Sequence, residues 1–167
     1  GMSGSMRLCH AEELLRKHDH VIWDFGHITV RLNDPRRFGA VVWHPHGDGP
    51  VLTHPLLKQL GVEPLSDDFT IAHLYQGLKR KKKAIKTALL DGDIVVGVGN
   101  IYASESLFLA KINPKVSAQS LSKARVERLH AAILSTLNAA LASGGSTLRD
   151  FLNANGEPGS YFEIHAN

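Results

Sequence analysis

Two glycines followed by an asparagine, in the segment Val96-Gly97-Val98-Gly99-Asn100, constrain this chain more than any other feature. Glycine lets the backbone bend sharply, and residues 101–110, which follow, are predicted to form a helix. The first amides of a helix have no acceptor inside it, so they can bind an anion. Asn100 is predicted to cap this helix and to offer its side-chain amide to a phosphate oxygen. The segment therefore predicts a turn between two helices that contacts the backbone of a nucleic acid.

Two other kinds of structure have similar local sequences. An ordinary turn between helices uses glycine for its backbone geometry alone, and it remains the main alternative. A dinucleotide-binding loop needs a third glycine and a preceding βαβ pattern, and both are missing at this position.

A cluster of basic residues precedes the turn. Residues 79–83 read Lys-Arg-Lys-Lys-Lys, and Lys86 follows shortly after. Such a run often forms only a solvated helix face. Here it leads into the helix before the glycine turn, which favours DNA, and Lys86 is predicted to lie near the turn. Because the net charge is only +3, this clustering is the better indication of a phosphate-binding surface.

Composition excludes several classes of protein. No apolar run approaches the ~20 residues needed to span a bilayer, and residues 1–10 lack the apolar stretch of a signal peptide. Cys9 is the only cysteine, so the chain can form neither an internal disulfide nor a cysteine-rich zinc site. No triad spacing for a nucleophile is recognisable, and Asp91 and Asp93 fit a turn better than acid–base catalysis. We expect no membrane partner and a cytoplasmic location.

The pattern along the chain predicts an α+β fold with the strands first. Gly26-His27 suits a two-residue hairpin turn, and Asp34–Gly39 suits a second turn. Three strands alone make a poor independent fold, so they are expected to be part of a larger β-sandwich. The Gly-, His- and Pro-rich residues 45–50 resemble a linker, which predicts domains at 1–45 and 46–167. The predicted strands are 20–25, 28–32 and 40–43, and the predicted helices are 52–60, 71–79, 83–90, 101–110, 122–142 and 147–154. Asp67 or Asp68 is the predicted cap of the helix at 71–79.

Four motifs in order carry a resemblance to a known family. They are Asp34-Pro35-Arg36-Arg37-Phe38-Gly39, Pro64-Leu65-Ser66-Asp67-Asp68-Phe69, VGVGNIYASESLF at residues 96–108, and Gly144-Gly145-Ser146-Thr147-Leu148-Arg149-Asp150-Phe151. Together they resemble the formamidopyrimidine-DNA glycosylases, the Fpg/MutM family of base-excision repair enzymes. The third motif is similar to the family's helix-two-turn-helix segment. The resemblance covers essentially the whole chain.

The resemblance implies an activity that this chain is not expected to perform alone. Members of the family are bifunctional glycosylases and abasic-site lyases that remove oxidised purines, with an N-terminal proline amine as nucleophile. That proline begins a Pro-Glu sequence, whereas this chain begins Gly1-Met2-Ser3. The family's four-cysteine zinc finger has no counterpart here. We expect an interior, inactive fragment that binds DNA and contains no zinc or other cofactor.

The resemblance also assigns site residues. Asn100 and the backbone near Ile101 and Tyr102 would bind DNA phosphates, and His18 would lie near another phosphate. Without the resemblance, His18 and His20 read as a histidine pair at a strand edge, and a metal site is poorly supported. The loop at 153–162 would close over the flipped lesion.

The motif at 34–39 resembles a loop that fills the hole left when a nucleotide leaves the duplex. Arg36 would bond the orphan base, while Phe38 and Met2 would enter the hole. Without the resemblance, Arg36 and Phe38 read as a β-turn with surface arginines and a half-buried ring. Met2 also reads as a start codon after a tag residue.

A second function of a different class remains open. The helix-two-turn-helix unit also resembles parts of a small-subunit ribosomal protein and of a topoisomerase, so the alternative hypothesis is a non-catalytic module that binds nucleic acid, RNA included. The first hypothesis predicts damaged double-stranded DNA as partner and a nucleoid-associated location in bacteria. The oligomeric state is left open by the sequence.

Overall fold

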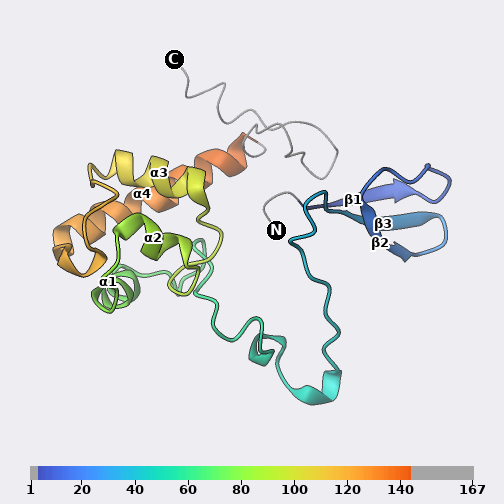
Figure 1. The fold of residues 1–167 in the computed structure, drawn as a ribbon, viewed down its shortest axis with the longest axis horizontal. Coiled ribbons are helices and arrows are strands. Elements are labelled where there is room, and N and C mark those ends of the chain that lie inside the picture. Colours follow the sequence, from blue (N-terminus) through green and yellow to red (C-terminus); the bar gives the residue numbers. More distant parts are fainter. Residues whose placement is uncertain (1–3, 144–167) are drawn as a thin grey trace. The chain divides into compact units, whose positions relative to one another are not determined.

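The structure is a computed structural model of the 167-residue chain and describes residues 4–143 (Figure 1). Contacts within the chain divide the described part into two compact units. The strand unit includes residues 4–43 and the helical unit is His44–Asn138. Strands precede helices along the sequence, so the predicted α+β class is confirmed.

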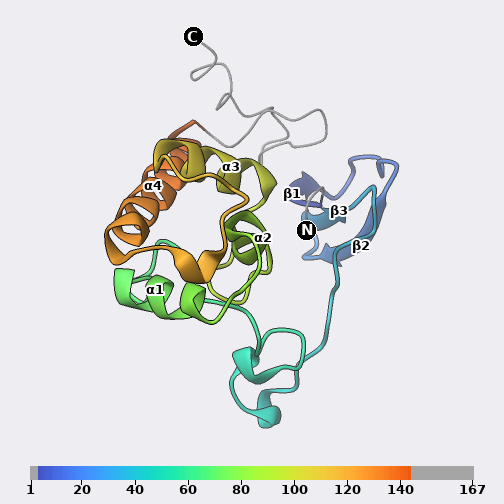
Figure 2. The same cartoon turned by 60° about the vertical axis from the view of Figure 1, so that its left-hand side comes forward.

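The strand unit is a three-stranded antiparallel sheet. β1 (Ser5–His10) and β2 (Asp19–Asp24) both pair with β3 (Ile28–Asn33), which lies between them (Figure 2). The predicted strands at 20–25 and 28–32 are confirmed to within one residue. The hairpin turn also forms as predicted: Gly26 has φ +88° and the Phe25 amide donates to the Ile28 carbonyl at 3.0 Å.

The prediction of a third strand at 40–43 is wrong. Those residues belong to no strand among the described residues, and the third strand is β1 instead. Residues 40–43 are Ala-Val-Val-Trp, a sequence of strong β-propensity, but propensity forms a strand only where a partner edge is present. β1 was missed because its pairing with β3 links residues that lie far apart in the sequence.

Charge and apolarity are distributed unusually between the two faces of this sheet. Arg7 and Cys9 of β1 are buried on the same face as Arg31, their neighbour on β3. On the opposite face, Met6 and Leu8 are 56% and 73% exposed. The same face includes the cross-strand partners Val21, Trp23, Val30 and Leu32. Within the described residues, the apolar face is thus the more exposed one.

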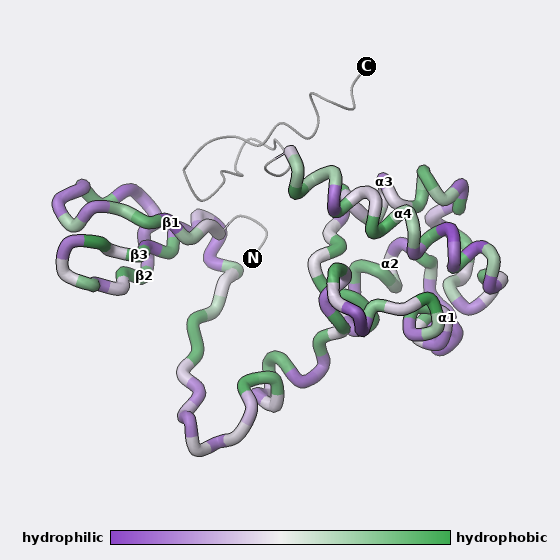
Figure 3. The backbone as a smooth tube through the Cα atoms, turned by 180° about the vertical axis from the view of Figure 1, so that it is seen from behind, coloured by the Kyte–Doolittle hydropathy of each residue, from purple (hydrophilic) through white to green (hydrophobic). Residues whose placement is uncertain are grey.

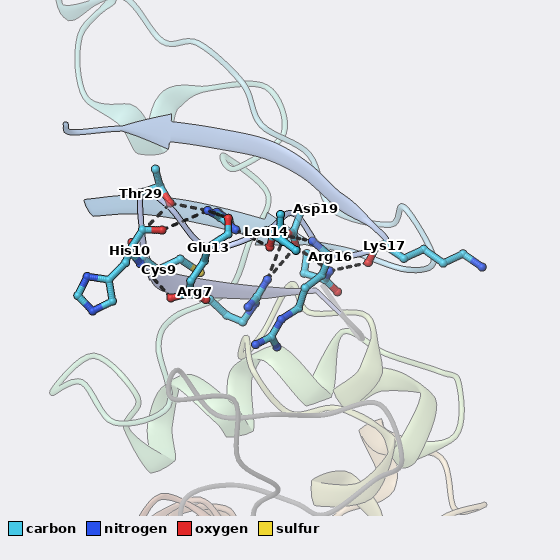
Figure 4. Close-up of polar contacts among 11 residues, drawn as sticks. Arg7, Cys9, His10, Glu13, Leu14, Arg16, Lys17, Asp19 and Thr29 are labelled. Atoms are coloured by element: carbon cyan, nitrogen blue, oxygen red, sulfur yellow. Dashed lines mark hydrogen bonds and ion pairs between the residues drawn. The ribbon is translucent and has the colours of Figure 1, made fainter. Parts of the chain in front are cut away.

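Arginine side chains hold the loop between β1 and β2 (residues 11–18) against the buried face. The Arg31 guanidinium donates to the carbonyls of Glu13 at 2.8 Å and Leu14 at 3.1 Å. Arg7 donates to both carboxylate oxygens of Asp19, at 3.0 and 3.1 Å (Figure 4). Asn33 donates to the same carboxylate at 2.8 Å. The loop is therefore fixed by buried charged side chains rather than by apolar packing.

The helical unit contains three α-helices, most of a fourth, α4, and short 3₁₀ turns. The α-helices are α1 (Ile71–Lys79), α2 (Ile85–Leu90), α3 (Asn100–Leu109) and α4 (Lys123–Ala142), and the 3₁₀ turns are η1 (His46–Asp48), η2 (Val51–Thr53) and η3 (Ala118–Ser120). The prediction for α1 is confirmed at both ends, and those for α2, α3 and α4 to within two residues. The helix predicted at 147–154 lies outside the described residues.

Two local predictions in this unit are wrong. Residues 52–60 form no α-helix: Pro55 interrupts them, and Leu52, Leu56 and Leu60 stay exposed instead of packing on the part of the chain that the structure describes. The cap of α1 is Thr70, whose hydroxyl accepts the His73 amide at 3.1 Å, rather than Asp67 or Asp68. Residues 66–69 turn once more before the helix starts, so the two aspartates lie too far from its first amides.

All four α-helices contribute to one apolar core. Its fully buried side chains include Leu74 and Leu78 of α1, Ile85 and Leu89 of α2, Leu107 of α3, and Leu129 and Ile133 of α4. Along these helices hydrophobic and hydrophilic residues alternate (Figure 3), as expected where one face of a helix is buried. This core supports the glycine turn, which is next in the chain after α2.

Candidate nucleic-acid interface

The glycine turn bends as the sequence predicts. Gly97 has φ +74°, a conformation that glycine adopts without strain. Gly99 is extended, with φ −78° and ψ −174°, and its carbonyl accepts the first helical hydrogen bond from Ala103 at 2.9 Å. Val95 and Val98 are buried on either side of the bend. The start of α3 is therefore held firmly by the core below it.

Asn100 is not the cap of α3. Gly99 occupies that position, and Asn100 is the first helical residue. Within the described residues the exposed Asn100 side chain has no hydrogen-bonding partner, and the amides of Asn100 and Ile101 have no acceptor. Because its carboxamide is not used for capping, Asn100 can offer it to a phosphate. The Tyr102 side chain is partly buried and packs against the core.

Three lysines of the basic run form hydrogen bonds with other residues of this chain. Lys81 bonds Asp93 and also Asp91, at 3.2 Å, and Lys83 bonds Asp91 at 2.8 Å. The hydrogen bond between Lys81 and Asp93 raises the pKa of Lys81. The hydrogen bond between Lys83 and Asp91 lowers the pKa of Asp91. Lys79 donates to the Gln119 carbonyl at 2.8 Å. Lys81 and Lys83 therefore brace the turn after α2, and their charges are balanced by the two aspartates.

Arg80 and Lys82 are the two members of the run that remain exposed and have no side-chain partner among residues 4–143. Sequence reasoning did not separate them from their neighbours, because nothing in a uniform run of positive charges shows which ones meet Asp91 and Asp93. Lys86 lies on α2 beside α3. It borders a pocket of ≈ 400 Å³ together with Ser104, Glu105 and Phe108.

In the strand unit, residues 34–39 form the predicted turn. The Arg37 amide donates to the Asp34 carbonyl at 3.1 Å, and Arg37 has φ +54°. The Phe38 ring is 67% exposed, and the Arg36 guanidinium lies 5.5 Å from its centre. A cation and a ring at this distance attract each other. The turn thus presents a guanidinium and an aromatic ring together to solvent.

His18 lies beside this turn. Its carbonyl accepts the Asp34 amide at 3.0 Å, and its ring centre lies 6.0 Å from that of His20. His18 has φ +76°, which only a minority of non-glycine residues adopt. Among residues 4–143 no group of three or more His, Cys, Asp or Glu side chains could hold a metal ion. Met2 and the loop at 153–162 lie outside the described residues.

Comparison with known proteins decides the family. The model of the formamidopyrimidine-DNA glycosylase H2TH domain matches residues 60–152, more than half of the chain. The chain belongs to the formamidopyrimidine-DNA glycosylase family. The match contains α1 to α4 and the glycine turn, so the helix-two-turn-helix assignment made from the motifs is confirmed.

Individual relatives agree with this assignment. The formamidopyrimidine-DNA glycosylase of Bordetella petrii is 59% identical over 99% of this chain, and that of Burkholderia lata is 52% identical over 98%. Among solved structures, the MutM (Fpg) protein of Thermus thermophilus matches with a TM-score of 0.85 at 38% identity, over 99% of this chain and 60% of its own. A Lactococcus lactis Fpg in complex with DNA containing an abasic site matches with a TM-score of 0.83 at 32% identity, over 98% of this chain and 59% of its own.

This chain spans about 60% of the length of the Bordetella and Burkholderia relatives. In the described part of the chain, no helix is long and apolar enough to cross a membrane.

Proposed function

We propose that this chain binds damaged double-stranded DNA as the central part of a bifunctional DNA glycosylase and abasic-site lyase that removes oxidised purines. One observation carries the proposal: within residues 4–143, two amides at the start of α3 have no acceptor and the exposed carboxamide of Asn100 beside them has no partner. A helix start of this kind binds phosphate through both hydrogen bonds and the helix dipole. The Lactococcus lactis relative, whose structure contains DNA with an abasic site, supports the same function.

Cationic side chains of the helical unit would strengthen this binding to the phosphate backbone. Arg80 and Lys82 are exposed and unpaired within the described residues, and Lys86 lies beside α3. Each cation that neutralises a phosphate releases counterions, so affinity would fall steeply as salt rises. This sequence-independent binding suits an enzyme that must search undamaged DNA, and it would place the protein on the bacterial nucleoid.

The turn of the strand unit would recognise the damaged site. When a nucleotide leaves the stack, its partner base loses its hydrogen bonds and a hole opens. The Arg36 guanidinium can donate to the orphan base, and the exposed Phe38 ring can fill the hole. His18, beside the turn, would meet a nearby phosphate, and Met2 would complete the wedge.

Substitution of Asn100 by alanine is expected to weaken duplex binding by ~1–3 kcal/mol, the scale of a hydrogen bond to a charged group. The loss arises because one donor to phosphate is removed from a preformed site. Fluorescence anisotropy with a labelled duplex at low salt measures it. Gln76→Ala is the matched control, since it removes an exposed carboxamide from α1. Unchanged affinity of Asn100→Ala would rule out the phosphate role.

We further propose that catalysis needs residues outside this chain. The family resemblance assigns attack on C1′ to an N-terminal proline amine, which forms a Schiff base and cleaves the strand by elimination. The chain spans about 60% of the relatives' length, which leaves room for this segment and for the zinc finger elsewhere. We propose that the chain itself holds no zinc and no other cofactor.

Borohydride trapping on a duplex containing 8-oxoguanine tests the catalytic proposal. We expect no covalent adduct with this chain, while a full-length relative trapped in parallel gives one. An adduct with this chain would show that it carries its own nucleophile. Tighter binding to RNA than to abasic duplex would instead favour a non-catalytic RNA-binding module.

A further inference from the structure

We infer that Asp34 is a positioning residue that holds Arg36 and Phe38 in the geometry needed at the orphan base. The inference rests on the function proposed above for the turn at residues 34–39. Asp34 is 3% exposed, and it lies at the first position of the turn. No contact with DNA is required of it, because its effect passes through the backbone of the residues that follow.

Three groups of Asp34 form hydrogen bonds: its carboxylate, its carbonyl and its amide. Its carboxylate accepts the Gly39 amide at 2.6 Å. Its carbonyl accepts the Arg37 amide at 3.1 Å and lies 3.1 Å from His20 Nε2. Its own amide donates to the His18 carbonyl at 3.0 Å. One residue thus ties both the middle and the end of the turn to the start of β2.

The pattern of these bonds explains which side chains the turn presents. The amides of residues 37 and 39 are directed toward Asp34, and the intervening residue, Phe38, is exposed. Arg36 precedes the first bonded amide, and its guanidinium lies near the Phe38 ring. Two fixed amides on alternate residues therefore determine where the arginine and the ring point. The left-handed φ of Arg37 is held in place by the same two bonds.

Gly39 fits the Asp34 carboxylate closely. A Cβ atom at position 39 would lie 2.9 Å from Asp34 Oδ2, closer than such atoms approach in real proteins. Gly39 has no positive φ, so this position needs glycine for space rather than for backbone freedom. Any larger residue at position 39 must displace the carboxylate. Substitutions at Asp34 and Gly39 are thus two independent ways to break one contact.

Binding of the chain to four abasic duplexes tests the inference. Each duplex carries a tetrahydrofuran abasic-site analogue opposite cytosine, adenine, guanine or thymine, and an intact duplex of the same sequence serves as reference. We expect the wild-type chain to prefer the abasic duplexes and to discriminate among the opposite bases. Asp34→Ala and Gly39→Ala should each reduce that discrimination about tenfold, the effect of one hydrogen bond to a charged group. Affinity for the intact duplex should stay unchanged.

Asp34→Asn is the conservative control, because its Oδ1 can still accept the Gly39 amide. We expect Asp34→Asn to retain most of the discrimination among the opposite bases. If discrimination were lost only because substitutions at this buried site destabilise the fold, Asp34→Asn would lose it too. Asn100→Ala provides the opposite pattern, since it should weaken binding to all five duplexes alike. Tryptophan fluorescence during thermal unfolding verifies that each variant is folded. If Asp34→Ala does not fold, Gly39→Ala, which keeps every side chain of the turn, decides the question.

The possible failures are distinguishable. A wild-type chain that binds all five duplexes equally would overturn the roles of Arg36 and Phe38, and the role of Asp34 with them. A wild-type chain that discriminates, together with folded Asp34→Ala or Gly39→Ala variants that discriminate equally well, would overturn only the positioning role. Loss of discrimination in Asp34→Asn to the same degree as in Asp34→Ala would also overturn it.

Discussion

Substitution of Asp19 by alanine is expected to lower the free energy of unfolding of the strand unit by about 3–5 kcal/mol, the usual result of breaking a buried ion pair from one side. The side chains of Arg7 and Asp19 are 6% and 0% exposed. Removing the carboxylate leaves the Arg7 charge buried without its partner. It also removes the acceptor of the Asn33 side chain and the Arg16 amide.

The same carboxylate makes the stability of this unit depend on pH. Burial alone would raise the pKa of Asp19, but hydrogen bonds from Asn33, the Arg16 amide and Arg7 outweigh burial and hold the pKa below its usual value. A lowered pKa means that the folded state favours the charged form. This stabilisation is complete above the pKa of the unfolded chain and disappears as the pH falls through the lower, folded value. The difference between wild type and variant should therefore shrink in acid.

Urea unfolding followed by tryptophan fluorescence measures both effects, because Trp23 lies on β2. Glu12→Ala is the matched control: it removes an exposed carboxylate from the same loop and should change stability by less than about 0.5 kcal/mol. A loss below about 1 kcal/mol for Asp19→Ala at neutral pH, or a loss that does not shrink in acid, would contradict the role of this network.

Substitution of Gly61 by alanine is expected to destabilise the helical unit by about 3 kcal/mol, the upper end of the range for overpacking. A Cβ atom at position 61 would lie 2.2 Å from the Ile94 carbonyl carbon and 2.5 Å from the Val95 nitrogen. These are backbone atoms, so no side-chain rotation can relieve the overlap. The segment must move away, which breaks the hydrogen bond from the Gly61 amide to the Gly92 carbonyl.

This displacement should also reach the glycine turn, to which we assign phosphate binding. The bridge between Val62 and Val95 comes directly before the bend, and the Val96 amide donates to the Val62 carbonyl at 3.1 Å. Affinity for intact duplex should therefore fall together with stability. Gly47→Ala is the control, since a Cβ at position 47 meets no described residue within 4 Å. Urea unfolding followed by far-ultraviolet circular dichroism measures the loss, and equal stability of the two variants would refute the close approach.

Local signals predicted the helices well. The boundaries of α1 follow from apolar spacing between a polar start and a basic end, and those of α4 follow from twenty residues of helical periodicity. The glycine turn was predicted for the same reason, because the bend at Gly97 is a property of a few adjacent residues. The family resemblance came from motifs within such local segments.

Predictions that depended on a distant partner failed. β1 has a weak local pattern and became a strand through β3, whereas residues 40–43 have a strong pattern and no partner strand in the described part of the chain. The basic run shows the same limitation. Asp91 and Asp93, which lie beyond the intervening helix α2, pair with Lys81 and Lys83 and not with the other members of the run.

The sequence alone therefore determined the order of the elements, the helices, the bend before α3 and the family. The tertiary structure decided that Gly99 rather than Asn100 caps α3, that Arg80 and Lys82 are the members of the basic run without a partner among residues 4–143, and that Asp34 ties the turn at residues 34–39. The physical reason is the range of the interactions. Backbone propensity and periodicity act between neighbours and are written in the sequence, whereas ion pairs and buried hydrogen bonds depend on which distant groups folding brings within about 3 Å.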